Sequence, residues 1–304
     1  MNALFPSRDP ATLRLARTLA NLAPTELPLL LEGETGTGKS WVARRLHRRS
    51  RPRLPFVVVD CGAVPEGLFP AEVFGHVAGA FTDARRARAG ALARAGAGTV
   101  VLDRLDVLPA AAQVSLLRAL DERRFVPLGG AVPVPLRARL VATAGPGVGE
   151  AVATGRLRAD LYHRVAGFHA VLPPLRQRRA DILPAARALL RRLGRRQGRE
   201  LHLADDAEEV LLAHPWPGNF RELETVLLRA CLTTSGNLIP AAALGLPASL
   251  DGVARHTTSA GGTLRDAMRR FALQVLAEEG GNVSRAARAL GISRRTLLRW
   301  RDAG

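Results

Sequence analysis

The sequence is short of lysine and of acidic residues. A single lysine, Lys39, occurs among 304 residues, and the other 43 of the 44 basic residues are arginines. Aspartate and glutamate total 27, which leaves a formal net charge of +17 at pH 7. This surplus favours a polyanionic partner such as nucleic acid, although an arginine-rich composition spread over a solvated surface would give the same total.

Cysteine and long apolar runs are also scarce, and these shortages exclude several classes of protein. Cys61 and Cys231 are too few for a disulfide framework or a four-cysteine zinc site, and the 7 histidines show no ligand spacing. No apolar run approaches the roughly 18 residues of a membrane helix, and the first residues lack the apolar core of a signal peptide. We therefore expect a cytoplasmic protein without a membrane segment.

The chain is long enough for about two domains and is apolar enough to fold. Short apolar runs alternate with helical stretches from about residue 27 to 175, which is typical of a parallel sheet with crossover helices. A helix over 112–123 would place Val114, Leu117 and Leu120 on one face. The expected strands lie at 27–31, 56–60, 99–103, 139–143 and 168–172.

Beyond residue 175 the pattern becomes helical, with helices expected at 181–193, 206–214 and 221–232. Residues 241–262 are rich in alanine, glycine and small polar residues without periodicity, which indicates a linker. We therefore predict an α/β unit at 1–175, a helical unit at 176–240, a linker at 241–262 and a compact helical unit at 263–304.

A phosphate-binding motif follows the first expected strand. It reads Gly33-Glu34-Thr35-Gly36-Thr37-Gly38-Lys39-Ser40 and matches G-x-x-x-x-G-K-[ST]. Its glycines let backbone N–H groups close around phosphates, Lys39 would reach the terminal phosphates, and Ser40 would ligate Mg²⁺. The strand at 99–103 ends in Asp103, where a nucleotide-binding sheet needs a carboxylate for Mg²⁺. The sequence therefore predicts a site for ATP and Mg²⁺.

The motifs that follow resemble, in order, those of the sigma-54-dependent transcriptional activators, bacterial enhancer-binding proteins of the AAA+ class. Gly79-Ala80-Phe81-Thr82-Asp83-Ala84 is similar to the family's GAFTGA loop, which implies contact with the sigma factor. Residues 157–164 resemble the segment with arginine fingers, which implies that Arg158 and Arg164 reach a neighbour's nucleotide. Residues 172–178 resemble the entry to a lid, and 216–224 a sensor segment whose Arg221 touches its own subunit's nucleotide.

The resemblance implies an AAA+ α/β domain with a helical lid, Thr143 on the sensor strand, and a homo-oligomer between a dimer and a hexameric ring. Its implied partners are the sigma-54 RNA polymerase holoenzyme and an upstream DNA site. The first expected strand begins at residue 27, so we expect no receiver or ligand-binding domain ahead of it in this sequence.

The sequence departs from the family pattern at the expected catalytic centre. The family follows its strand-end aspartate with the glutamate that activates water, whereas Asp103 is followed by Arg104, which cannot accept a proton. Asp60 stands where the family has asparagine, so we hypothesise an Asp60–Arg104 ion pair, with unrelated drift as the alternative. If Asp60 instead acts as the base, weak hydrolysis survives.

Three other family positions are changed: Asp83 replaces the second glycine of the loop, Ala144 replaces an asparagine after Thr143, and Ser40 replaces a glutamate that is common in the family. Two functions stay open as a result. The first is an ATP-binding, DNA-binding regulator that couples the nucleotide state of a ring to sigma-54. The alternative is a hydrolysis-deficient nucleotide-binding regulator, or a repressor, that does not act through sigma-54.

The C-terminal residues 263–304 concentrate positive charge, with nine arginines against four acids. Residues 281–300 have the layout of a helix-turn-helix, because Ser284 and Ser293 can cap two helices and Gly291 can form the turn between them. The segment resembles the Fis-type domain, which implies dimeric binding to a palindromic site; a generic basic hairpin is the alternative. The candidate DNA contacts are Ser293, Arg294, Arg295, Thr296 and Arg299.

Overall fold

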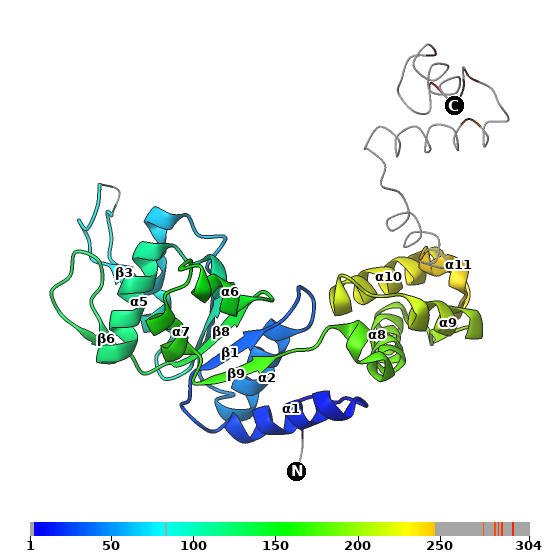
Figure 1. The fold of residues 1–304 in the computed structure, drawn as a ribbon, viewed down its shortest axis with the longest axis horizontal. Helices are drawn as coiled ribbons and strands as arrows, with labels where there is room; N and C mark the ends of the chain where they lie inside the picture. The colour runs from blue at the N-terminus through cyan, green and yellow to red at the C-terminus, as the bar shows by residue number, and fades with distance from the viewer. Residues whose placement is uncertain are drawn as a thin grey trace. The chain divides into compact units, whose positions relative to one another are not determined.

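Five parallel strands form the central sheet of the protein (Figure 1). The computed structural model describes residues 3–82 and 84–246, together with Leu276, Val283, Arg285, Ala287 and Arg294. The chain divides into a compact unit over Met1–Ala248, which carries the sheet, and a second unit over Ser249–Gly304. In spatial order the strands are β2 (Phe56–Asp60), β5 (Thr99–Asp103), β8 (Arg139–Ala144), β1 (Leu29–Glu32) and β9 (Phe168–Val171).

Alternate side chains of the strands enter two apolar cores on opposite faces of the sheet. On β1, Leu29 and Leu31 join the core formed with α1 and α2, whereas Leu30 joins the core on the other face. Because helices cover both faces, the strands are apolar on both sides, which explains the continuous apolar runs in the sequence. The helices of this part are α1 (Pro10–Leu22), α2 (Lys39–Ser50), α3 (Phe69–Phe74), α4 (Ala91–Ala95), α5 (Ala110–Glu122), α6 (Val148–Ala153) and α7 (Ala159–Val165).

Shorter elements connect these helices and strands. The 3₁₀ turns are η1 (Glu66–Leu68), η2 (Leu105–Val107), η3 (Leu175–Gln177) and η4 (Arg179–Asp181). The two-residue strands are β3 (Gly75–His76), β4 (Arg88–Ala89), β6 (Arg124–Phe125), β7 (Val134–Pro135), β10 (His202–Leu203) and β11 (Leu238–Ile239).

A helical lid follows the sheet and has a core of its own. Trp216 is fully buried in it, and its indole Nε1 donates a hydrogen bond to the Leu211 carbonyl at 2.9 Å. A buried indole with a satisfied N–H stabilises such a small core, because it combines a large apolar area with no unpaired polar group. The helices of the lid are α8 (Ile182–Gln197), α9 (Asp205–Ala213), α10 (Asn219–Thr233) and α11 (Ala241–Leu244).

Two details differ from the sequence-based expectations. Residues 241–246 were expected to begin the linker, but helix α11 lies there and its Leu244 is fully buried in the lid core. Helix α5 is rotated slightly from its expected orientation: Leu120 is buried and Leu117 packs against the core as expected, but Val114 is 53% exposed and Leu116 is buried instead. Gln113 explains the rotation: its buried amide bonds the carbonyls of Leu108 and Arg156 and the backbone N–H of Arg158, so a polar residue occupies the core face.

Within the described part of the chain, no helix has the length and apolar character needed to cross a membrane.

Candidate nucleotide-binding site

The phosphate loop connects β1 to the N-terminus of α2. Gly36 and Gly38 have φ angles of 80° and 103°, a backbone conformation that glycine adopts without strain. The Lys39 Nζ donates hydrogen bonds to the carbonyls of Gly33 at 2.6 Å and Glu34 at 3.0 Å, so the ammonium is held inside the loop. Burial lowers the pKa of Lys39, although the carboxylates of Asp103, Asp106 and Glu32 act in the opposite direction.

The carboxyl ends of β5 and β8 place Asp103 beside Thr143. The two strands pair in parallel, so residues at their ends meet at one edge of the sheet. The Thr143 hydroxyl donates to Asp103 Oδ1 at 2.5 Å and accepts from the backbone N–H of Arg104 at 3.0 Å. Thr143 thereby orients the carboxylate that the sequence assigns to Mg²⁺.

The residues of this edge fit a magnesium ion bound with a nucleotide. Ser40, in the first turn of α2, and Asp103 offer a hydroxyl and a carboxylate, which are oxygen ligands of the kind that Mg²⁺ prefers. Within residues 3–82 and 84–246, no group of three or more His, Cys, Asp or Glu side chains could hold a metal ion by itself. The cation would therefore take its remaining ligands from phosphate oxygens and water.

The hypothesised ion pair between Asp60 and Arg104 is present in the structure. Arg104 donates to Asp60 Oδ1 from Nε at 2.9 Å and from Nη2 at 2.5 Å, and the Gly62 N–H donates to the same oxygen at 3.0 Å. Partial desolvation raises the pKa of Asp60, but the hydrogen bonds from Arg104 and Gly62 outweigh it and hold the pKa below its usual value. Asp60 and Asp103 are paired in register on β2 and β5, so the ion pair adjoins the Mg²⁺ ligand.

Local backbone geometry supports this pair. Arg104 has a φ of 60°, which is uncommon for a residue other than glycine, and its N–H is held by Thr143. Gly62 leaves room for the guanidinium, since a Cβ at that position would lie 2.6 Å from Arg104 Cζ. The backbone conformation of Arg104, its hydrogen bonds to Asp60 and the absence of a Cβ at Gly62 together determine where the guanidinium lies.

The lid is fastened to the phosphate loop through Glu34. The Arg176 guanidinium donates to both carboxylate oxygens of Glu34, at 2.8 and 2.5 Å, and Asn219 Nδ2 donates to one of them at 3.1 Å. The hydrogen bonds from Arg176 and Asn219 lower the pKa of Glu34 to about 2. Glu34 was predicted among the nucleotide-binding residues, but its partners in the lid were not predicted.

Two further contacts join the lid to the same loop. The buried Arg178 stacks on the Phe220 ring at 4.6 Å and donates to the Thr37 carbonyl at 2.9 Å. The Phe220 N–H donates to the Gly36 carbonyl at 3.0 Å. Asn219, which precedes Phe220, is fully buried and has a φ of 53°.

The three arginines implied to contact nucleotide lie in different places. Arg221 on α10 is beside the phosphate loop, because its Cβ lies 3.2 Å from the position that a Cβ on Gly36 would occupy. Arg158 and Arg164 lie at the two ends of α7, about half exposed, and pair with Asp160 at 2.8 Å and Asp121 at 3.0 Å. Their reach into a neighbouring subunit stays a prediction.

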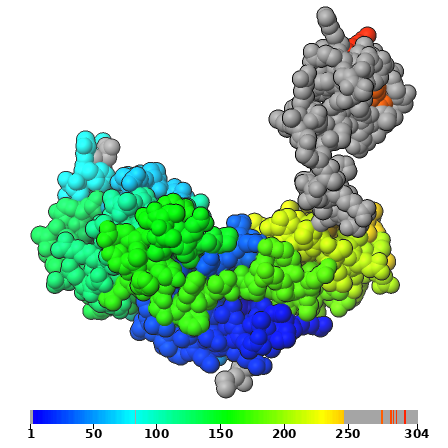
Figure 2. Space-filling model, in the orientation of Figure 1, coloured from blue at the N-terminus to red at the C-terminus, as the bar shows by residue number. Residues whose placement is uncertain are grey.

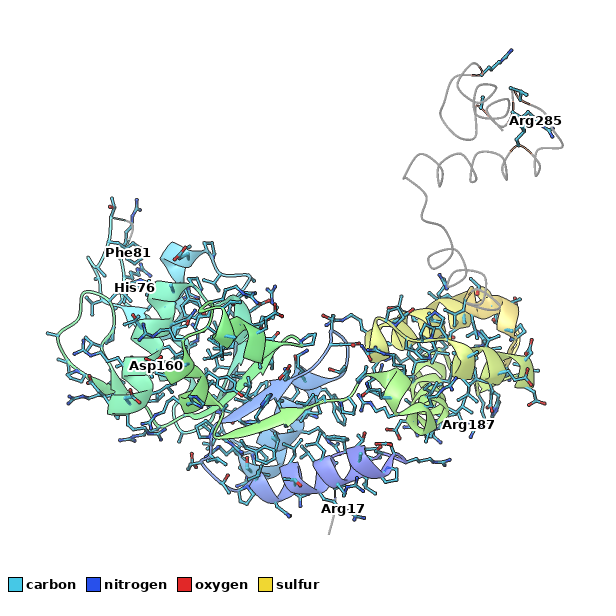
Figure 3. The ribbon with its side chains drawn as sticks, in the orientation of Figure 1. Arg17, His76, Phe81, Asp160, Arg187 and Arg285 are labelled. Atoms are coloured by element: carbon cyan, nitrogen blue, oxygen red, sulfur yellow. The ribbon has the colours of Figure 1, made fainter. Side chains whose placement is uncertain are left out.

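The predicted sigma-contact loop projects from the α/β part between β3 and β4, which pair in antiparallel fashion (Figure 2). Figure 3 shows Phe81 on this loop beyond His76, and the two rings are 4.9 Å apart. Phe81 is 40% exposed, whereas Ala84 is buried and accepts a hydrogen bond from the Gly79 N–H at 2.8 Å. The loop therefore exposes an aromatic side chain, and the hydrogen bond between Gly79 and Ala84 constrains its backbone. Asp83 lies outside the described residues.

The predicted DNA contacts fall almost entirely outside the described residues. Arg294 is described as helical and exposed, whereas Ser293, Arg295, Thr296 and Arg299 lie outside the described part of the chain. The DNA-contact assignments therefore stay predictions at the level of individual residues.

The parallel sheet, the phosphate loop and the lid together define a nucleotide-binding module of the AAA+ type. Models of three families match the chain in succession: a sigma-54 interaction domain over residues 6–170, an AAA+ ATPase lid domain over 176–260, and a bacterial regulatory protein domain of the Fis family over 273–301. The chain belongs to the family of sigma-54-dependent transcriptional regulators, and the fold and family predicted from the sequence are confirmed.

Individual relatives support the same assignment. The C4-dicarboxylate transport transcriptional regulatory protein DctD of Rhizobium meliloti is 40% identical over 95% of this chain and 62% of its own length. The sigma-54-dependent transcriptional activator SfnR of Pseudomonas putida is 39% identical over 90% of this chain and 75% of its own. The chain thus spans less than two thirds of DctD.

Solved structures of NtrX from Brucella abortus also match the fold. One is 29% identical with a TM-score of 0.74, covering 97% of this chain and 68% of that chain. Others were determined in complex with ATP, at a TM-score of 0.73, and with ADP, at 0.72.

Proposed function

We propose that this protein is a sigma-54-type transcription regulator that binds ATP with Mg²⁺ and hydrolyses it slowly, so that ATP binding rather than turnover sets its state. The observation that carries the proposal is the Asp60–Arg104 ion pair beside Asp103. Nucleotide binding is supported by the phosphate loop and by the complexes of NtrX with ATP and ADP. The proposed partners are DNA at residues 263–304 and the sigma-54 holoenzyme at the Phe81 loop.

The binding half of the mechanism follows from the phosphate loop. On ATP binding, the Lys39 ammonium would leave its two carbonyl partners and contact the terminal phosphates. The backbone N–H groups of the loop would bind the phosphates that lie nearer the adenosine. Ser40 and Asp103 would hold Mg²⁺, which neutralises phosphate charge when it is bound. Arg221 would add a positive charge from the lid.

The hydrolytic half lacks a base at the expected position. A water molecule that attacks the γ-phosphate needs a proton acceptor, and the guanidinium of Arg104 is protonated at every physiological pH. Asp60 is the nearest substitute, but it already accepts three hydrogen bonds and its pKa is held low, which makes it a weak base. Neither member of the pair therefore serves as a general base.

In a homo-oligomer, Arg158 and Arg164 would contact the nucleotide of the adjacent subunit. Both would first have to leave the carboxylates with which they pair within their own chain. These pairs are exposed to solvent, so the cost of exchanging a carboxylate for a phosphate is small.

The test compares ATP turnover by the wild type with turnover by the Arg104→Glu and Asp60→Asn/Arg104→Glu variants, the second of which restores the family pair. A positioned base contributes about 10²- to 10⁴-fold, so we expect the double variant to exceed the wild type by at least about 100-fold. Binding of a fluorescent ATP analogue should be similar in all three proteins and lost in Lys39→Ala, which controls for an intact site.

Two results would contradict the proposal. One is wild-type turnover equal to that of the double variant with unchanged ATP binding. The other is substantial wild-type turnover that Asp60→Asn abolishes, which would identify Asp60 as the base.

A further inference from the structure

A basic groove of about 640 Å³ lies on the lid, along one side of α8 and around β10. Four arginines and two glutamates line it, together with three leucines and a histidine. The nucleotide site described above uses none of these residues. Figure 3 labels one of them, Arg187, at the surface of the lid. The arginines are Arg187, Arg191, Arg195 and Arg199.

Three of these arginines form a row along the helix. Arg187, Arg191 and Arg195 are spaced four residues apart and therefore lie on one face of α8, with about 6 Å of axial rise between neighbours. Like charges at this spacing oppose helix formation, so the row is not explained by the stability of α8.

The arginines at the two ends of the groove are fixed, and those between them are not. Arg187 pairs with Glu208, and Arg199 donates to the Thr234 carbonyl at 2.8 Å and to the Gly236 carbonyl. Arg191 and Arg195 are exposed and have no carboxylate partner among the described residues. Two guanidinium groups are therefore available to an external anion.

The floor of the groove strengthens their effect. Leu190 and Leu201 are almost fully buried, at 1% and 4% exposure, so the arginines lie above an apolar surface. Charges near a low-dielectric surface interact more strongly with a bound anion than charges surrounded by water.

We propose that this groove binds the phosphate backbone of DNA, as a second contact that reads no sequence. The unpaired arginines favour a polymer over a single small anion, because Arg191 and Arg195 are separated by about 6 Å along the helix instead of converging on one point. Guanidinium groups bind phosphates through two parallel hydrogen bonds, and such contacts position a protein on a duplex. The inference rests on the proposed DNA binding by residues 263–304 of the same chain.

The experiment measures the affinity of the full chain for a random-sequence duplex over a range of salt concentrations. Each phosphate contact that is lost reduces the slope of log K against log salt by about 0.9, so Arg191→Gln/Arg195→Gln should reduce it by about 1.8. The matched control is Arg14→Gln/Arg17→Gln, which removes the same charge from the exposed face of α1. Its slope should match that of the wild type.

A gain-of-affinity variant separates loss of contact from loss of folding. Glu200 lines the groove and is 86% exposed, so Glu200→Gln should tighten binding to the duplex, whereas a misfolded variant would weaken it. The proposal is overturned if the groove and control variants change the slope equally, or if the groove variant weakens only the binding of inorganic pyrophosphate. If an Arg294→Gln/Arg295→Gln variant changes the slope and the groove variant does not, DNA binding stands and the groove proposal fails.

Discussion

Substitution of Gly36 by alanine should separate the lid from the phosphate loop. A Cβ at Gly36 would lie 2.1 Å from the Gly218 carbonyl oxygen, a backbone atom that cannot rotate away. Gly36 also has a φ of 80°, where alanine is strained. The lid must therefore shift by about 1 Å, because such contacts are normally not shorter than about 3 Å.

The expected loss of stability combines strain with broken lid contacts. The strain of alanine at positive φ is about 1 to 2 kcal/mol, of which 0.4 to about 1 kcal/mol is offset by the less flexible unfolded chain. The shift also weakens the Phe220–Gly36 hydrogen bond and the bond from Asn219 to the Thr35 carbonyl, at about 1 kcal/mol each. The total is roughly 3 kcal/mol.

Gly155→Ala is the matched control. Gly155 has a similar φ of 73°, but no atom lies within 4 Å of the position that its Cβ would take, so only the strain applies. In urea unfolding without nucleotide, followed by tryptophan fluorescence, Gly155→Ala should lose about 0.5 to 1 kcal/mol and Gly36→Ala about 2 kcal/mol more. Equal losses would refute the packing of the lid on the loop.

Two further predictions follow from perturbed pKa values. The folded pKa of Glu34, about 2, lies below the unfolded value near 4.5, so its contribution to stability is complete above pH 4.5 and is lost as the pH falls toward 2. Glu34 should account for about 1 to 2 kcal/mol of the fall in the free energy of unfolding between pH 4.5 and pH 2, after allowance for solvent screening. Glu34→Gln should abolish this part of the fall, and an unchanged dependence of the unfolding free energy on pH would contradict the assignment. Burial raises the pKa of Cys61 to about 12, so an aromatic disulfide reagent at pH 8 should modify it only after unfolding, and rapid modification of the folded protein would contradict its burial.

The elements of the sheet were predictable because each strand is a short apolar run, and β2, β5 and β8 also carry a candidate site residue at or near their ends. The expected strand at 99–103 matches β5 in full, including its terminal Asp103. The pairing of Asp60 with Arg104 was also predictable, because both positions depart from one family pattern and both lie at the carboxyl ends of the adjacent parallel strands β2 and β5. In these cases local sequence and sheet topology act together.

Contacts between distant segments could not be predicted in the same way. Glu34 and Arg176 are separated by 142 positions, and nothing local to either residue indicates their pairing. The placement of Val114 on the core face of α5 was wrong, because the neighbouring Gln113 is buried there with three hydrogen bonds between its amide and the backbone. Hydrogen bonds of this kind form between groups that only the fold brings together, so the spacing of apolar residues does not predict them.

The single lysine has a practical consequence for the study of this protein. Lys39 provides the only ε-amino group in the sequence, and burial lowers the pKa of that group. An amine-selective acylating reagent can therefore modify one side chain in the whole protein, inside the phosphate loop. The extent of acylation at Lys39, measured by mass spectrometry, would report the fraction of molecules in which the phosphate loop is shielded from the reagent. The measurement needs neither a label nor a substitution.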